Sequence, residues 1–180
     1  MSEVVKLSQS TGARERGGKP GGEALLPRPQ HEFPFNAQHP NALAIYCSDG
    51  RFTRAVEMLA EEALEHTRLD TLTIPGGPGT LSLQSGGYQE CEHMRRAASF
   101  LITGHHIETV ILVAHEGCGW YREKMGFYPP DTVRERQVAD LRDTAQWVQQ
   151  KHPNTELHLF YAHSEEDTLH FERIHASPGA

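Results

Sequence analysis

The chain has 180 residues, enough for one domain with a hydrophobic core but not comfortably for two. Its formal net charge is −7, and its acidic residues are spread along the chain, which argues against a nucleic-acid footprint or an anionic membrane surface as partner. We therefore expect a small-molecule substrate or a protein partner, and neither nucleic acid nor a membrane.

The sequence also gives expectations about localisation and thiol chemistry. No stretch approaches the ~20 apolar residues that a membrane span needs. The start, MSEVVKLSQS, lacks the basic and apolar regions of a secretory signal. Three cysteines are too few for a disulfide framework in a chain of this size. These features predict a cytoplasmic protein with reduced thiols, which are available as metal ligands.

Residues 1–38 are rich in glycine, proline and charged residues and show no apolar period, which predicts a flexible N-terminal arm. Residues 39–180 are then expected to form a single α/β domain. Apolar runs predict strands at residues 42–49, 71–74, 109–114 and 156–162. Apolar residues at helical spacing predict helices that include residues 56–64, 91–104 and 138–148.

Strands and helices therefore alternate, and a proline-glycine loop at residues 75–79 closes the second strand. This alternation is typical of a mostly parallel central sheet flanked by helices, with right-handed crossovers. The third run, TVILVA, is the most apolar and is expected at the centre of the sheet.

Residues that carry chemistry follow the first and third predicted strands. Cys47, Asp49 and Arg51 come at the end of the first, and His115 and Cys118 at the end of the third. Ligands of open parallel sheets bind beyond the carboxyl ends of the strands, so these residues are expected to converge. Two thiolates and one imidazole are the ligand set of a catalytic zinc site whose fourth position stays open.

Each half of this pattern is weak alone, because a single cysteine is more often an ordinary buried residue than a ligand. The two halves at two strand ends together favour a metal site with Zn²⁺ as the cofactor. Zinc would act as a Lewis acid and lower the pKa of its bound water. Asp49 could accept a hydrogen bond from that water, and Arg51 could hold the carboxylate ionised and correctly aimed.

The motifs CSDGR and HEGCG resemble the zinc signature of the beta-class carbonic anhydrases, Cys-x-Asp-x-Arg and His-x-x-Cys-Gly, and the resemblance runs from about residue 41 to 174. It implies a beta-carbonic-anhydrase-like fold and a zinc lyase that reversibly hydrates carbon dioxide to bicarbonate. Cys47, His115 and Cys118 would be the ligands, and Asp49 with Arg51 the dyad that orients a zinc-bound hydroxide. A homodimer or higher even homo-oligomer is also implied, in which the N-terminal arm could contact the partner.

The chain departs from the family pattern in two places. Gly50 stands where the family usually has serine, and IPGGPGT stands where it typically has Arg-Asn-Ala-Gly-Asn. Gly76 and Gly77 could still present backbone N–H groups to the substrate, whereas the two prolines have none. The altered loop keeps open a zinc hydrolase of carbonyl sulfide or carbon disulfide. A non-catalytic zinc-stabilised dimeric scaffold is disfavoured, because structural zinc sites normally have four protein ligands.

Two further interpretations concern residues near these motifs. Cys91 falls on the apolar stripe of its predicted helix, so we expect it to pack in the core rather than bind metal. Trp120 and Tyr121 follow the second motif directly, and the sequence favours equally a place in a cleft and an anchoring contact with the next helix.

Overall fold

The computed structural model describes residues 33–176. The chain divides into a unit of residues 1–36 and a unit of residues 37–180, and every described helix and strand belongs to the second. The arm predicted for residues 1–38 lies almost entirely outside the described residues. Among the helices that are described, none combines the length and apolar character needed to cross a membrane.

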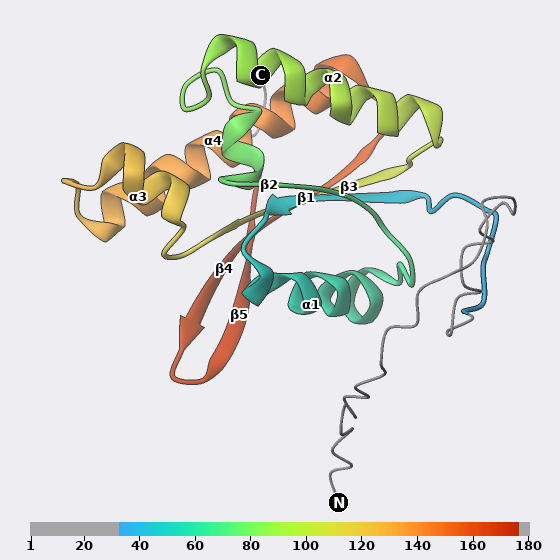
Figure 1. Ribbon diagram of the computed structural model, residues 1–180, viewed down its shortest axis with the longest axis horizontal. Coiled ribbons are helices and arrows are strands. Elements are labelled where there is room, and N and C mark those ends of the chain that lie inside the picture. Colours follow the sequence, from blue (N-terminus) through green and yellow to red (C-terminus); the bar gives the residue numbers. More distant parts are fainter. Residues whose placement is uncertain (1–32, 177–180) are drawn as a thin grey trace, which may run out of the picture. The chain divides into compact units, whose positions relative to one another are not determined.

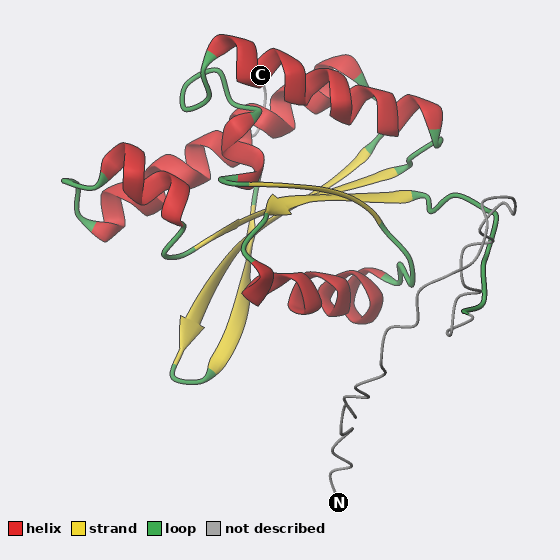
Figure 2. Ribbon diagram, in the orientation of Figure 1, coloured by secondary structure: helices red, strands yellow, loops and turns green. Residues whose placement is uncertain are grey.

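Helices and strands alternate as far as β3, as the sequence predicts, and then two helices and two strands follow in succession (Figure 2). In chain order they are β1 (Ala42–Cys47), α1 (Gly50–Met58), the π-helical turn η1 (Leu59–Ala63), β2 (Asp70–Ile74), the 3₁₀ turn η2 (Gly77–Thr80), α2 (Tyr88–Gly104), β3 (Thr109–His115), α3 (Gly119–Met125), α4 (Pro130–Lys151), β4 (Glu156–Glu165) and β5 (Thr168–Ile174). The sequence analysis did not predict α3, whose seven residues are too few to establish an apolar period.

The sheet has the strand order β2-β1-β3-β4-β5. Its first four strands are parallel, and β5 returns antiparallel to β4 as a hairpin. The predicted mostly parallel α/β fold is therefore confirmed. All seven residues of β3 are buried, in agreement with its expected central place. Because β1 pairs directly with β3, the carboxyl ends of these two strands lie side by side.

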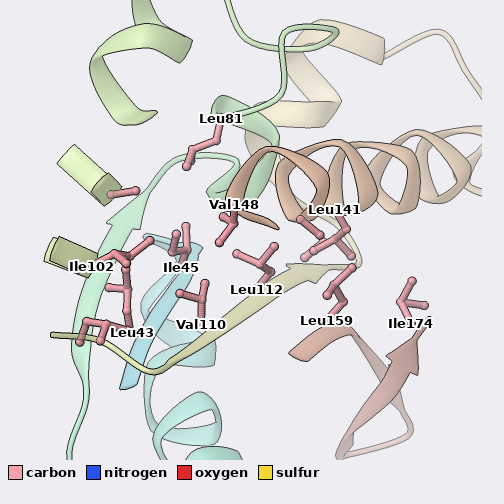
Figure 3. Close-up of a cluster of buried hydrophobic side chains, with 14 of the residues drawn as sticks. Leu43, Ile45, Leu81, Ile102, Val110, Leu112, Leu141, Val148, Leu159 and Ile174 are labelled. Carbon is pink, nitrogen blue, oxygen red and sulfur yellow. The ribbon is translucent and has the colours of Figure 1, made fainter. Parts of the chain in front are cut away.

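Helices cover both faces of the sheet, with α2 and α4 on one side and α1 on the other (Figure 1). Alternate residues of β1 and β3 pack against α2 and α4, and Figure 3 shows Leu43, Ile45 and Leu112 among them. The intervening residues, such as Tyr46 and Val113, pack against α1. This alternation is the period expected of strands buried on both faces.

The structure confirms that Cys91, in helix α2, packs in the core. The side chain of Cys91 is fully buried, and its Sγ donates a hydrogen bond to the backbone oxygen of Leu81 at 3.1 Å. Burial raises the pKa of this thiol above its ordinary value, so it remains protonated. Cys91 is thus a packing residue.

The central place of β3 generates a stability prediction. Leu112→Ala should lower the free energy of unfolding by about 2–5 kcal/mol, because it leaves a cavity between the sheet and α4. Urea denaturation measures the change. Leu83→Ala is the matched control: Leu83 is 51% exposed, so its truncation should cost less than about 0.5 kcal/mol. Similar losses in both variants would contradict the described core.

Candidate metal centre

The ends of β1 and β3 bring together the three predicted metal ligands. Cys47 is the last residue of β1, His115 is the last of β3, and Cys118 is the N-cap of α3. Their candidate ligand atoms all lie within 4.8 Å of one another, and all three residues are buried. Within residues 33–176, this is the one group of at least three histidine, cysteine or acidic residues that could hold a metal ion.

The imidazole of His115 is oriented for coordination. Its Nδ1 lies 2.8 Å from the backbone oxygen of Glu116, and a carbonyl can only accept, so Nδ1 carries the proton. The ring packs against Phe52 with centroids 4.1 Å apart. Nε2 is buried and has no hydrogen-bond partner among the described residues. A buried nitrogen lone pair without a partner is costly, and a cation would satisfy it.

The two sulfur atoms have the separation that zinc requires. Sγ of Cys47 and Sγ of Cys118 are 3.8 Å apart. Two sulfurs bound tetrahedrally to one zinc ion at about 2.3 Å would be about 3.8 Å apart. Thiolates with an imidazole are also a donor set that suits zinc rather than hard cations such as Mg²⁺. The residues present therefore fit a zinc ion.

The two thiols are within hydrogen-bond distance of each other. A hydrogen bond from Cys118 lowers the pKa of Cys47 well below its usual range, and burial opposes this shift; the nearby His115 ring and the N–H groups of Asp49 and Gly76 lower the pKa further. The same pairing raises the pKa of Cys118, because a second thiolate would lie beside the first. The two thiols therefore shift in opposite directions, and a bound cation would favour the thiolate form of both.

Asp49 and Arg51 form an ion pair next to this cluster. Arg51 donates from Nη2 to Oδ2 of Asp49 at 2.6 Å and from Nε to Oδ1 at 3.0 Å. Oδ1 also caps the N-terminus of α1 by accepting from the backbone N–H of Arg51. The guanidinium lowers the pKa of Asp49 to about 2, so the carboxylate is ionised near neutral pH. The Asp49 carboxylate is paired with Arg51, and it is not part of the cluster of candidate ligand atoms.

The glycine-rich loop packs directly against the end of β1. Gly77 has a φ of +52°, and a Cβ there would lie 2.8 Å from the backbone of Tyr46 and Cys47. Gly76 has a φ of +84°, and a Cβ there would likewise be too close to the Trp120 ring. The sequence analysis expected the N–H groups of Gly76 and Gly77 to be available to a substrate, which stays a prediction; the N–H of Gly76 also lowers the pKa of Cys47.

Sequence reasoning did not find several polar residues behind the cluster. Gln137, Asp140 and Thr144 of α4 are buried, and each bonds to a segment next to the candidate ligands. Tyr121 is also buried and donates to Asp140 at 2.7 Å, which decides for the anchoring alternative. The only signal in the sequence was the presence of three polar residues at helical spacing beside the apolar stripe of residues 138–148.

A pocket of about 490 Å³ adjoins the site on the side of the ligand loop. Cys118 lines it together with apolar residues such as Val133 and with polar and charged residues, among them Gln137, Glu116 and Arg134. Neither Asp49 nor Arg51 lines this pocket. The dyad therefore lies on a different side of the cluster.

A model of the family described as "Putative carbonic anhydrase" matches residues 37–172. The chain belongs to this carbonic anhydrase family. The resemblance of its two motifs is thereby confirmed at the level of the family. A search of curated proteins found no match.

Solved structures of beta-carbonic anhydrases are similar to this carbonic anhydrase family member. CafA of Aspergillus fumigatus is 14% identical, with 75% of this chain and 76% of that chain covered and a TM-score of 0.46. Beta-carbonic anhydrase isoform I of Trichomonas vaginalis is 12% identical, with 78% of this chain and 87% of that chain covered and a TM-score of 0.46. The Coccomyxa enzyme, in complex with acetazolamide, is 14% identical, with 76% and 74% covered and a TM-score of 0.46.

The packing of the loop on β1 generates a prediction for two glycines. Gly77→Ala should lower the free energy of unfolding by about 1–3 kcal/mol, because its positive φ and the nearby backbone both oppose a Cβ. The matched control is Gly50→Ala in α1. A Cβ at Gly50 would meet no side chain or distant backbone within 4 Å, so this substitution should be neutral or stabilising by up to about 1 kcal/mol. Urea unfolding compares the two. Equal effects would mean that the loop does not press on β1.

Proposed function

We propose that this chain binds one Zn²⁺ through Cys47, His115 and Cys118 and catalyses the reversible hydration of carbon dioxide to bicarbonate. The observation that carries the proposal is the buried group of two sulfurs and an Nε2 that has no hydrogen-bond partner within residues 33–176, in a member of a carbonic anhydrase family. Three protein ligands leave one position of a tetrahedral zinc ion for the reaction, unlike a closed structural site.

When bound, zinc supplies a Lewis acid that lowers the pKa of a coordinated water towards neutrality. The chain's own residues orient the reactants. The hydrogen bond from Nδ1 to Glu116 fixes the ring of His115. Asp49 offers an ionised carboxylate that accepts a hydrogen bond from the attacking group, and Arg51 keeps this carboxylate away from the metal.

The same proposal includes a second copy of the chain. The Arg51 side chain is 73% exposed, although it would take part in catalysis, and the pocket beside Cys118 does not enclose it. A subunit interface over the dyad would exclude water and strengthen the ion pair. We therefore propose a homodimer or higher even homo-oligomer, with carbon dioxide and bicarbonate as its small-molecule partners.

Stopped-flow hydration of carbon dioxide, on protein whose zinc content and oligomeric state are measured on the same sample, tests the proposal. The wild type should contain about one zinc per chain and turn over. Cys118→Ala should lose both zinc and activity, because it removes a ligand. Cys91→Ala is the control, since it removes an equally buried thiol outside the cluster, and it should keep zinc.

Other outcomes would contradict specific parts of the proposal. Full zinc content in Cys118→Ala would mean that the ligand set is wrong. A zinc-loaded wild type without carbon dioxide hydration would be assayed with carbonyl sulfide and carbon disulfide. Inactivity on all three substrates would overturn the enzymatic proposal and favour a zinc-stabilised scaffold.

The dyad is tested separately. Arg51→Ala should retain zinc but lose activity at least about tenfold, because Asp49 is then free to turn towards the metal. Arg54→Ala is the matched control: this arginine lies on the same helix, pairs with Glu57 at 3.3 Å, and should leave turnover unchanged. Zinc content and stopped-flow rates are measured on both variants. Wild-type turnover in Arg51→Ala would refute the role of the ion pair.

A further inference from the structure

Helix α4 carries a line of buried polar side chains on the face that meets the sheet. Gln137, Asp140 and Thr144 are each at most 2% exposed. Their spacing of three and four residues places them on one face of the helix, beside the apolar residues that fill the core. Buried polar groups are costly unless they are hydrogen-bonded, so the partners of these three side chains are informative.

Gln137 holds the end of β3. Its Nε2 donates to the backbone oxygen of His115 at 2.8 Å, and its Oε1 accepts from the hydroxyl of Tyr161 at 3.3 Å. The first bond fixes the main chain of a candidate ligand. The second fixes the amide itself, so that Nε2 rather than Oε1 faces the carbonyl.

Asp140 holds the segment that follows Cys118. Its carboxylate is fully buried and accepts from the hydroxyl of Tyr121 at 2.7 Å, from Oγ of Ser85 at 2.5 Å and from Arg136 at 2.8 Å. Tyr121 lies in the first turn of α3, and the N-cap of that helix is Cys118. Four donor bonds, counting both from Arg136, satisfy the charge and fix α3 to α4.

Thr144 holds the glycine-rich loop. Its Oγ1 donates to the backbone oxygen of Pro78 at 2.8 Å. This loop packs on the end of β1 through Gly77 and directs the N–H of Gly76 at the Cys47 sulfur. Thr144 therefore fixes the segment that supports the third candidate ligand.

We propose that Gln137, Asp140 and Thr144 are positioning residues of the metal centre, through which one helix sets the mutual geometry of all three ligand segments. This inference rests on the proposed function, because it takes Cys47, His115 and Cys118 as the ligands. Partners of this kind, outside the coordination shell, typically change metal affinity or activity about 10–100-fold. The alternative is that the three residues only stabilise the fold.

The rate of zinc release into an excess of chelator separates these roles. Thr144→Val keeps the shape and loses the hydroxyl, so it should release zinc roughly tenfold faster than the wild type. Thr144→Ser keeps the hydroxyl and should restore slow release. Val148→Ala is the control for stability, because Val148 is fully buried on the same helix and has no partner in the metal centre. It should lower the melting temperature without changing zinc release.

A second variant and a spectrum support the same comparison. Gln137→Met should also release zinc faster, since it frees the main chain of His115. In protein reconstituted with cobalt(II), the visible absorption should change in Thr144→Val and Gln137→Met but not in Val148→Ala. Zinc release that follows thermal stability alone across all four variants would overturn the positioning role.

The outcome stays separable from that of the proposed function. A wild type that binds zinc but hydrates no carbon dioxide would overturn the catalytic proposal only, and the release rates would still decide the role of α4. A wild type that binds no zinc would overturn both.

Discussion

The direct parallel pairing of β1 with β3 forces two cysteines and a histidine into one buried space, and the surrounding structure depends on that convergence. The two thiols lie 3.8 Å apart, within hydrogen-bond distance of each other, and Nε2 of the imidazole has no hydrogen-bond partner among the described residues. Left alone, such a group would favour relaxation into separate rotamers with better partners. It is retained because rigid elements end there: two buried strands and the first turn of α3.

Backbone N–H groups favour negative charge on both sulfurs, although on Cys118 the neighbouring Cys47 and burial outweigh them. The N–H groups of Asp49 and Gly76 lower the pKa of Cys47, and those of Trp120 and Tyr121 act on Cys118 in the same direction. The Asp49 carboxylate is neutralised separately, by Arg51. The anionic groups of the site are thus divided between main-chain donors on one side and a guanidinium on the other. Asp49 is thus engaged with Arg51 and lies outside the group of candidate ligand atoms.

The sequence was sufficient for those parts of the molecule that depend on local periodicity. The four parallel strands, the helices α1, α2 and α4, and the convergence of Cys47 with His115 and Cys118 follow from apolar patterns and from the topology of parallel sheets. The apolar patterns did not predict β5. The contacts of Gln137, Asp140 and Thr144 could not be predicted in this way, because a polar residue within a helical stripe does not reveal its partner. The carbonyl of Pro78 lies 66 positions from Thr144 in the chain, and only the packed fold brings the two together.

The glycine-rich loop is stabilised by contacts with other segments as well as by its own residues. The stretch IPGGPGT has no long polar side chain that could hold its own conformation, unlike the polar stretch typical of the beta class at this place. Two of its carbonyls accept hydrogen bonds from hydroxyls at 2.8 Å: Thr80 donates to Gly77 within the loop, and Thr144 of α4 donates to Pro78. Glycine has no side chain, so it contributes no polar group to the site, but it allows the loop backbone to contact β1 directly. A substitution of Thr144 can therefore change the loop beside Cys47, although Thr144 does not line the pocket at the site.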